Sequence, residues 1–476
     1  MPLLPLPDTR LRRLAPGPCA ARPARACPAR AGAWSLARGR SRVGAGALLV
    51  ALATTLAAPP GRAQTSAPAP ALRVAAEPLQ VLHWWTSASE RLAADALVRR
   101  LADEGIAWQD AAIPGGAGLG AGKVLRSRVL AGDAPEVTQI IGVSIREWAD
   151  MGLLLELDAV AAAGQWRGVL FPTIAQVVQH RQHVVAAPLG IHRINTLLVN
   201  RRVLARLQLA PPRTWAELEQ VARQVRAAGG VPLAQSSEPW QVATLFESLL
   251  LAEGGPSLYR DLFVRHDPAA AADPRLAQAL DRLRMLKAWM PRPLAERPWT
   301  EGVAQLRRGE AAMLAMGDWA KGELLAQGAA IDDDFSCVPW PGTAAYHLYS
   351  VDTLTMFAKD YSREAAQQRF ARTVMSPAVQ AEYNAIKGSV TVRRDADPAR
   401  MDSCARASWT AFGQGPAAQA PSLVHRMATD EASKDAIIAE LRRFFVDDSV
   451  AAAEVQRRLA GIFKALPARG ARSSGP

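Results

Sequence analysis

Residues 79–84 (LQVLHW) and the stretch 89–103 that follows them decide the fold class of this chain. The first segment is short and mainly apolar, which predicts a strand. The second segment spaces its apolar residues with a helical period. Those on one face are Leu92, Ala93, Leu97 and Leu101. A strand that leads into an amphipathic helix is the unit of an α/β layered domain.

Strands and helices continue to alternate along the chain. Further extended segments are expected at residues 137–142, 183–188, 193–200, 311–316 and 347–357. Further helices are expected at residues 145–152, 214–228, 244–254, 273–290, 300–308, 363–374, 377–386, 401–412, 433–445 and 449–465. One helix opens with a capping box, in which Thr214 is the N-cap residue and Glu217 follows three positions later.

The chain is longer than one hydrophobic core usually organises. Its 476 residues predict two domains, or two lobes of one chain. A net charge of +12 raises the question of a nucleic-acid partner. However, ten arginines against a single acid, Asp8, lie before residue 64. The basic charge belongs mostly to the N-terminal segment, so no nucleic-acid partner is expected.

The N-terminal segment has the pattern of an export signal. An arginine-rich, acid-poor region precedes an apolar stretch at residues 43–58, and small residues follow up to Ala63. We therefore expect a signal peptide over residues 1–63, cleavage near Ala63 and a periplasmic mature chain. A retained membrane anchor is the alternative, although the apolar stretch is short for a membrane span and is followed by two prolines.

Two cysteines remain if the signal peptide is removed. They are Cys337 and Cys404, since Cys19 and Cys27 lie in the leader. Two cysteines in an exported chain most simply form one disulfide. The alternative is a pair of buried free thiols.

The glycine-rich stretch 115–123 (GGAGLGAGK) departs from a phosphate-binding loop at two positions. Ala117 adds a Cβ where the loop needs glycine, and Val124 lacks the hydroxyl that would bind Mg²⁺. A glycine-rich turn near a binding cleft is expected instead. The chain also lacks the HExxH, paired CxxC, EF-hand and GxSxG patterns. No catalytic residue, metal or cofactor is therefore expected.

Trp84 and Trp85 end the first predicted strand, and Glu90 follows shortly after them. In open α/β sheets, ligands bind just beyond the carboxyl ends of the strands. Aromatic faces stack on the C–H faces of a sugar ring, while a carboxylate accepts hydrogen bonds from its hydroxyls. The pattern favours a sugar site, and two core tryptophans are the alternative.

Residues 81–90 (VLHWWTSASE) resemble the opening of the glucose/mannose-binding proteins of ABC sugar importers, within the extracellular solute-binding proteins of family 1. Similar signatures recur in order and span about residues 80–466. They include QIIGVSIREWA at 139–149, PLGIHRIN at 188–195, EPWQ at 238–241, AMGDWAK at 315–321, IKGS at 386–389 and SLVHRMA at 422–428.

The resemblance implies a two-lobed α/β fold of the type II periplasmic-binding-protein kind. A ligand cleft lies between the lobes, which hinge crossovers near residues 191–200 and 347–352 would join. The expected segments are a linker at 64–75, a first lobe at 76–192 and 350–386, a second lobe at 193–349 and 387–466, and a disordered tail at 467–476. The family's cysteine pair also resembles Cys337 and Cys404, which supports the disulfide.

The resemblance further implies which residues hold the sugar. Trp84 and Trp85 resemble the stacking aromatics, and Glu90 resembles a hydroxyl acceptor beside them. Asp352 resembles the family's carboxylate in the cleft, and Lys387 its cationic donor. A solvated surface position is the alternative for Lys387.

His425 resembles a donor from the second lobe. Other positions in matching motifs are expected to line the cleft, namely His192, Trp240, Gln241, Asp318 and Trp319. Core positions in a lobe are the alternative for Trp240 and Trp319.

Two positions depart from the family pattern. Ile141 stands where a lysine is expected, and Ser350 stands in the cleft where an asparagine is expected two residues before Asp352. If the family residues contact sugar hydroxyls, each loss would cost about 0.5 to 3 kcal/mol, or up to about a hundredfold in affinity. We therefore expect weaker sugar binding or a preference for a different sugar.

The favoured function is capture of a monosaccharide, glucose or mannose-like, by a monomer that delivers it to the permease of an ABC transporter. A sugar sensor for a signalling partner is one alternative. A secreted glycoside hydrolase is the other, and it predicts turnover of a glycoside by a pair of carboxylates.

Overall fold

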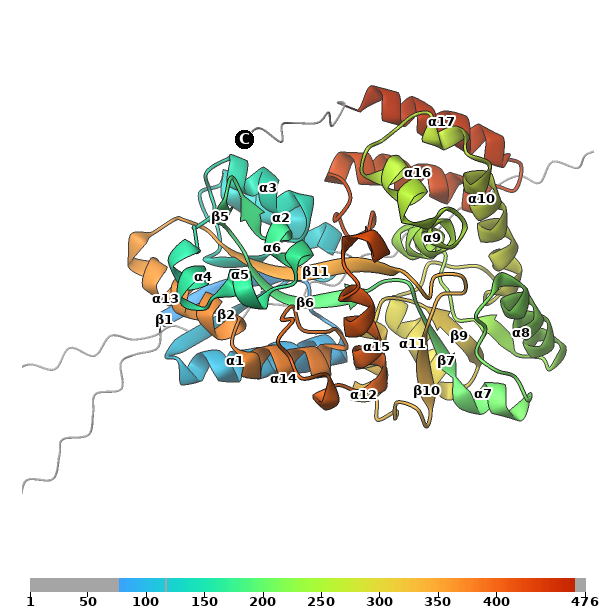
Figure 1. Ribbon diagram of the computed structural model, residues 1–476, viewed down its shortest axis with the longest axis horizontal. Helices are drawn as coiled ribbons and strands as arrows, with labels where there is room; N and C mark the ends of the chain where they lie inside the picture. Colours follow the sequence, from blue (N-terminus) through green and yellow to red (C-terminus); the bar gives the residue numbers. More distant parts are fainter. Residues whose placement is uncertain (1–76, 116–117, 467–476) are drawn as a thin grey trace, which may run out of the picture. The chain divides into compact units, whose positions relative to one another are not determined.

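The computed structural model describes residues 77–115 and 118–466 (Figure 1). The expected signal peptide, its cleavage near Ala63, the linker and the tail at 467–476 lie outside the described residues. In the part of the chain that is described, no helix combines the length and apolar character that a membrane crossing requires.

Six strands form the first sheet. In chain order they are β1 (Glu77–His83), β2 (Ile106–Ala112), β3 (Val137–Gln139), β6 (Ala187–Arg193), β11 (His347–Met356) and β12 (Gln419–Pro421). Their order across the sheet is β12-β11-β3-β1-β2, and β6 also pairs with β11. β1 is parallel to β2 and β3, whereas β11 runs antiparallel to β3 and β6.

β11 is the strand that joins this sheet together. All ten of its residues are buried. Its beginning pairs with β12 and its end with β3, while β6 pairs along Tyr349–Leu354. Its sequence includes Ser350 and Asp352, and buried polar groups of this kind need hydrogen-bonding partners.

Four strands form the second sheet. They are β7 (Thr196–Asn200), β8 (Val231–Leu233), β9 (Ala311–Ala315) and β10 (Phe335–Pro339), in the order β10-β7-β9-β8. β7 is antiparallel to both of its neighbours, and β8 is parallel to β9. A separate two-stranded sheet pairs β4 (Gln179–His180) with β5 (His183–Val184).

Helices surround both sheets (Figure 1). They are α1 (Ala88–Asp103), α2 (Leu119–Leu130), α3 (Val143–Asp150), α4 (Asp158–Ala163), α5 (Trp166–Val169), α6 (Pro172–Val177), α7 (Arg201–Arg206), α8 (Trp215–Ala227), α9 (Pro239–Phe263), α10 (Pro274–Leu286), α11 (Trp299–Arg308), α12 (Trp319–Ala326), α13 (Tyr361–Val374), α14 (Pro377–Lys387), α15 (Ser403–Phe412), α16 (Glu431–Val446) and α17 (Ala452–Ala465). α1 packs along α14, and α9 packs against α10 and α16. The predicted capping box of α8 is confirmed, because Thr214 accepts a hydrogen bond from the Glu217 N–H.

The buried apolar side chains form two separate cores. The first core includes Leu79, Ile191 and Val351, and the second core includes Leu197 and Phe246. The chain passes from one core to the other three times. Within the described residues, the passages lie between β6 and β7, at the start of β11 between Leu348 and Tyr349, and between α15 and β12.

Part of the segment after α14 packs in the first core, and not in the lobe that was expected from the sequence. Residues 387–466 were expected in the second lobe, whereas Val390 and Phe412 pack in the first core. Two backbone hydrogen bonds explain this placement. The Ile191 N–H donates to the Val390 carbonyl at 2.7 Å, and the Val390 N–H donates to the Ile191 carbonyl at 2.9 Å.

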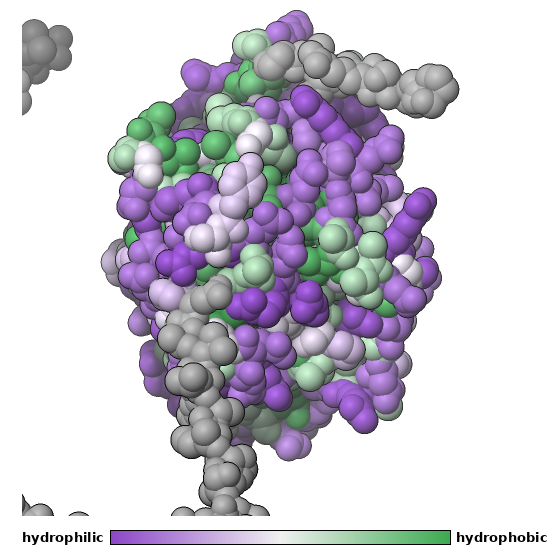
Figure 2. Space-filling model, turned by 90° about the vertical axis from the view of Figure 1, so that its left-hand side faces the viewer, coloured by the Kyte–Doolittle hydropathy of each residue, from purple (hydrophilic) through white to green (hydrophobic). Residues whose placement is uncertain are grey.

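One surface of the molecule is mainly hydrophilic. Figure 2 shows that hydrophilic residues cover most of this face and that its apolar residues occur in small, scattered groups. Among the described residues, the exposed large apolar side chains are Leu92, Leu130, Met151, Met285, Tyr361 and Val446. Scattered apolar residues of this kind are normal on soluble proteins.

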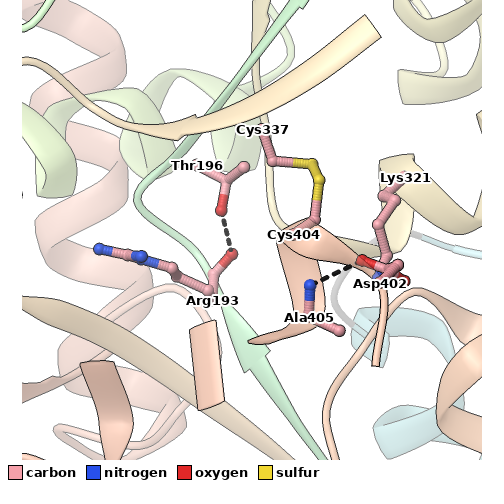
Figure 3. Close-up of a disulfide and its surroundings, with 7 residues drawn as sticks. All are labelled: Arg193, Thr196, Lys321, Cys337, Asp402, Cys404 and Ala405. Atoms are coloured by element: carbon pink, nitrogen blue, oxygen red, sulfur yellow. Dashed lines mark hydrogen bonds and ion pairs between the residues drawn. A yellow bond between two sulfur atoms is a disulfide. The ribbon is translucent and has the colours of Figure 1, made fainter. Parts of the chain in front are cut away.

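Cys337 of β10 and Cys404 of α15 form a disulfide, with their Cα atoms 5.4 Å apart (Figure 3). The predicted pairing is therefore confirmed. The bridge ties the second sheet to a helix whose Ala405 and Phe412 pack in the first core. Beside it, the buried Lys321 ammonium donates to Asp402 at 2.9 Å.

Removing the disulfide should lower the stability of the protein. The bridged cysteines are 67 positions apart, and a loop of that length predicts about 4 kcal/mol in the chain-entropy model. We expect the Cys337→Ser/Cys404→Ser double variant to unfold at a lower temperature than the wild type when circular dichroism is followed on heating. The wild type in a thiol reductant is the matched control and should approach the variant. Equal unfolding temperatures for the oxidised wild type and the variant would contradict this role.

Candidate functional site

A cavity of about 500 Å³ lies between segments of the two cores. Its size is typical of small-molecule sites. On one side it is lined by the β1–α1 turn, β6, β11 and the end of α14, and on the other by the starts of α9, α11 and α12. The lining residues that the sequence analysis named are Trp84, Glu90, His192, Trp240, Trp319, Ser350, Asp352, Lys387 and His425, together with Ile141.

Three of the expected site residues do not line this cavity. Trp85 is fully buried, with its ring 5.7 Å from that of Tyr383. Neighbouring side chains of extended backbone point to opposite sides, so Trp84 faces the cavity and Trp85 the first core. The expectation that Trp85 stacks on a ligand is therefore wrong.

Gln241 and Asp318 lie behind the cavity wall and contact residues that line it. The Gln241 side chain donates to Glu238 Oε2 at 2.8 Å and to the Arg297 carbonyl at 2.9 Å, so it supports two lining residues. Asp318 Oδ1 lies 2.6 Å from His192 Nδ1, and its Oδ2 accepts from the Arg193 N–H. Both residues position others and do not contact the cavity.

His192 carries a buried charge between two carboxylates. Its Nδ1 lies 2.6 Å from Asp318 Oδ1, and its Nε2 lies 3.3 Å from Asp352 Oδ2. Burial alone would lower the pKa of His192, but the charges of Asp318 and Asp352 outweigh it and raise the pKa to about 9. The ring is therefore an imidazolium at neutral pH and donates from both nitrogens.

The hydrogen-bond chain continues to the tip of β1. Gln139 of β3 donates to Asp352 Oδ1 at 3.0 Å, and its Oε1 accepts from the Trp84 N–H at 3.3 Å. Burial favours the neutral form of Asp352, yet its pKa is lowered because the charge and hydrogen bond of His192, the Lys387 charge and the Gln139 hydrogen bond favour the carboxylate.

Glu90 and Lys387 form a second buried pair at the cavity. Lys387 Nζ lies 3.0 Å from Glu90 Oε1. Glu90 Oε2 also accepts from the Thr86 and Ser87 N–H groups and closes the capping box of α1. Burial would raise the pKa of Glu90, but the Lys387 charge and these donors lower it.

Gly388 lets the end of α14 approach α12. It ends the helix with a φ of +94°, and a Cβ there would lie 2.3 Å from the Asp318 carbonyl oxygen. The left-handed conformation and the close contact both require glycine. Lys387 is therefore held next to the segment that carries Asp318.

Four tryptophans give the cavity flat apolar surfaces, namely Trp84, Trp240, Trp299 and Trp319. The Trp84 ring packs on Gly118, where a Cβ would lie 2.8 Å from its Cε3 atom. The Trp319 ring lies 5.4 Å from that of His192 and 5.2 Å from that of His425. Burial and the His192 charge lower the pKa of His425 to about 3, so this ring is neutral.

Sequence reasoning missed several lining residues. They are Thr86, Ser87, Pro114, Gly115, Glu238, Glu296, Arg297, Pro298, Trp299 and Thr300. Pro114 and Gly115 lie at the glycine-rich stretch, for which a turn near a cleft was expected. For residues 296–300, the sequence offered one signal, which is that Trp299 stands directly before the helix predicted to begin at residue 300.

Among the described residues, one group of metal-ligand type lies together outside the cavity. His183 Nδ1 lies 2.6 Å from Asp158 Oδ2 and 3.4 Å from Glu156 Oε2. Glu156 and His183 are exposed, and the Asp158 carboxylate also accepts from the Val184 N–H. Ion pairing and this turn contact account for the group without a metal.

Comparison with known families decides the class of protein. Residues 88–381, more than half of the chain, match the bacterial extracellular solute-binding proteins. The chain belongs to this family. The solute-binding proteins are binding proteins and not enzymes, which agrees with the expectation drawn from the sequence.

Relatives of this solute-binding protein carry a common description. A "probable sugar-binding periplasmic protein" of Brucella melitensis is 36% identical over 328 residues, which are 69% of this chain and 78% of the relative. A protein of the same description from Rhizobium meliloti is 35% identical over 381 residues, or 78% of this chain and 90% of the relative.

A solved structure shows the same two-lobed fold. The bacterial solute receptor AcbH, described as having an exclusive preference for β-D-galactopyranose, matches with a TM-score of 0.70 and 16% identity. The match covers 81% of this chain and 97% of AcbH. The two-lobed α/β fold predicted from the sequence is thereby confirmed.

The His192 charge can be tested by titration. Its folded pKa lies above the usual 6.5, so its stabilising contribution is full below about pH 6.5 and is lost as the pH rises through about 9. We expect a midpoint near 9 for His192 in an NMR titration of the imidazole carbons. In Asp318→Asn it should fall by about one unit or more, because one of the two charges is gone.

The control for this titration is Asp95→Asn, which removes a carboxylate that is 54% exposed on α1. It should leave the His192 midpoint unchanged. A wild-type midpoint near 6.5, or the same midpoint in Asp318→Asn as in the wild type, would contradict the assignment.

Proposed function

We propose that this chain is the sugar-binding component of an ABC import system, which captures a glucose or mannose-like monosaccharide and delivers it to a membrane permease. The observation that carries the proposal is the cavity itself. It places four tryptophans around ionised groups that already have partners. Tryptophan faces suit the C–H faces of a sugar, and oriented polar groups suit its hydroxyls.

The pairing of charges supports a neutral ligand. Lys387 is paired with Glu90, and His192 with Asp352 and Asp318. Glu296 at the rim is paired with Arg442. An anionic or cationic solute would have to compete with these partners after losing its own hydration, which is costly in a buried site. A polyhydroxyl ligand can instead add hydrogen bonds without breaking the pairs.

Each cavity side chain then has a distinct role. The Trp84 face stacks on the ring of the sugar, with Trp240 and Trp319 closing the opposite side. Glu90 and Asp352 accept hydrogen bonds from hydroxyls, because an ionised carboxylate has acceptor sites beyond those already used. Lys387, His192 and His425 complete the polar wall, and Ser350 offers a short hydroxyl.

The same carboxylates do not suit glycoside hydrolysis. A glycosidase needs one carboxyl that keeps its proton near neutral pH as a general acid. The pKa values of Glu90 and Asp352 are both lowered by their cationic neighbours. Binding without turnover therefore fits these groups better.

The names of the relatives support the cellular setting. Both are described as sugar-binding periplasmic proteins, which supports a periplasmic site of action for this chain. Delivery to a permease by a monomer completes the proposal, with the lobes closing over the sugar about the β6–β7 passage and the passage at the start of β11.

Calorimetric titration of the purified protein with glucose, mannose, galactose and xylose tests this function. We expect saturable one-to-one binding of at least one sugar. Trp84→Ala should weaken that binding about tenfold, since it removes a stacking face. Trp215→Ala, which removes a tryptophan outside the cavity, is the matched control. Failure of all four sugars to bind would overturn the monosaccharide assignment.

Ile141 gives a second test. Its side chain lines the cavity, where the family pattern has a lysine. We expect Ile141→Lys to tighten glucose binding by up to about a hundredfold, because an ammonium adds a charged donor for a hydroxyl. Ile141→Met has similar length without the charge and should leave the affinity near that of the wild type. An unchanged Kd in Ile141→Lys would count against a hydroxyl contact at this position.

A further inference from the structure

Behind His425 lies a carboxyl group that does not line the cavity. Glu247 of α9 is fully buried, as is Ser422, and both lie beyond the cavity wall formed by His425. Ser422 Oγ lies 2.9 Å from Glu247 Oε2 and 2.8 Å from His425 Nδ1. The hydroxyl therefore bridges a buried carboxyl and a ring that faces the ligand site.

The Ser422 hydroxyl has only one hydrogen to give. It also accepts from the His425 backbone N–H at 3.2 Å, which leaves it one donation and one acceptance for its two other partners. If Glu247 is protonated, it donates to Ser422, which then donates to His425 Nδ1. If Glu247 is ionised, Ser422 donates to Glu247 and accepts from an Nδ1–H of His425.

Glu247, Ser422 and His425 form a hydrogen-bond relay, and both arrangements satisfy every group in it. The two arrangements leave His425 in different tautomers. With Nδ1 as an acceptor, the hydrogen of the neutral ring is on Nε2. With Nδ1 as a donor, Nε2 carries a lone pair. Because Ser422 occupies Nδ1, Nε2 is the nitrogen left for the cavity.

We propose that Glu247 is a positioning residue whose proton, passed through Ser422, sets whether His425 offers the ligand a hydrogen-bond donor or an acceptor. Raising the pH moves the Glu247 proton onto Ser422, the Ser422 proton onto Nδ1, and the Nε2 proton to water. One proton leaves and each heavy atom keeps its normal valence. The contact of Nε2 with a sugar hydroxyl rests on the proposed function, whereas the relay itself does not.

The surroundings place this change near neutral pH. Burial raises the pKa of Glu247 to about 8, against the lowering effect of donors such as the Val424 N–H at 2.6 Å. The low pKa of His425 keeps its ring neutral over the same range, so only the tautomer changes. Tyr259 is the other titratable group that acts on Glu247, and Tyr349 acts on Tyr259 in turn. The charged or titratable groups that act on His425 are His192, Asp352, Arg426 and Lys434.

The test is ¹⁵N NMR of the ligand-free protein labelled at histidine, because the two neutral tautomers have different ring nitrogen shifts. The His425 signals are assigned by their loss in His425→Gln. We expect the hydrogen on Nε2 at pH 6.5 and mainly on Nδ1 at pH 9.5. A tautomer that stays the same across this range would overturn the proposal, and this measurement needs no folded variant of Glu247.

Variants separate the relay from general pH effects. Glu247→Gln cannot ionise, so His425 should keep one tautomer at every pH. Ser422→Ala breaks the bridge and should also remove the pH dependence. Glu440→Gln, which changes another buried carboxylate, is the matched control and should titrate like the wild type. A tautomer change that persists in Glu247→Gln would overturn the proposal, whether or not any sugar binds.

Discussion

The site depends on the pairing of the buried His192 ring with the carboxylates of Asp318 and Asp352. A hydrogen-bond chain runs from the Trp84 backbone through Gln139, Asp352 and His192 to Asp318. It joins the ends of β1, β3 and β6 and the middle of β11 to the start of α12, and so connects the first sheet to the second core. A charge that has left water must keep its partners. That requirement holds these side chains in place at the cavity.

The same constraint explains how the cavity can hold polar side chains and still suit a neutral solute. Lys387 and Glu90 satisfy one another before a ligand arrives, as do His192 and its two carboxylates, so these groups are held in place and need little rearrangement to bind. The tryptophans then contribute shape and apolar contact. Glu247 differs from this pattern because its neighbours are neutral, and it is the buried carboxyl in the relay that can gain or lose a proton near neutral pH.

The sequence predicts local features well and distant partners poorly. Periodicity located α1 within one residue and the capping box of α8, because both depend on neighbouring positions. β2 was missed because its polar residues break the apolar pattern of a strand. The sequence alone could not decide that Trp84 faces the cavity and Trp85 the core, because this depends on the orientation of the backbone. The partner of Glu90 is separated from it by 297 positions, so only the resemblance brought Lys387 into the site.

The three passages between the cores have a consequence for how the chain acquires its structure. β11 pairs with β3 and β6, and the whole second sheet lies between β6 and β11 in the sequence. The ribosome must therefore release residue 356 before the first sheet can gain its central strand. Contacts over such separations form slowly, and a nascent chain remains without its first core for most of its synthesis. Until β11 is made, the apolar residues that will form the first core lack the strand that joins their sheet.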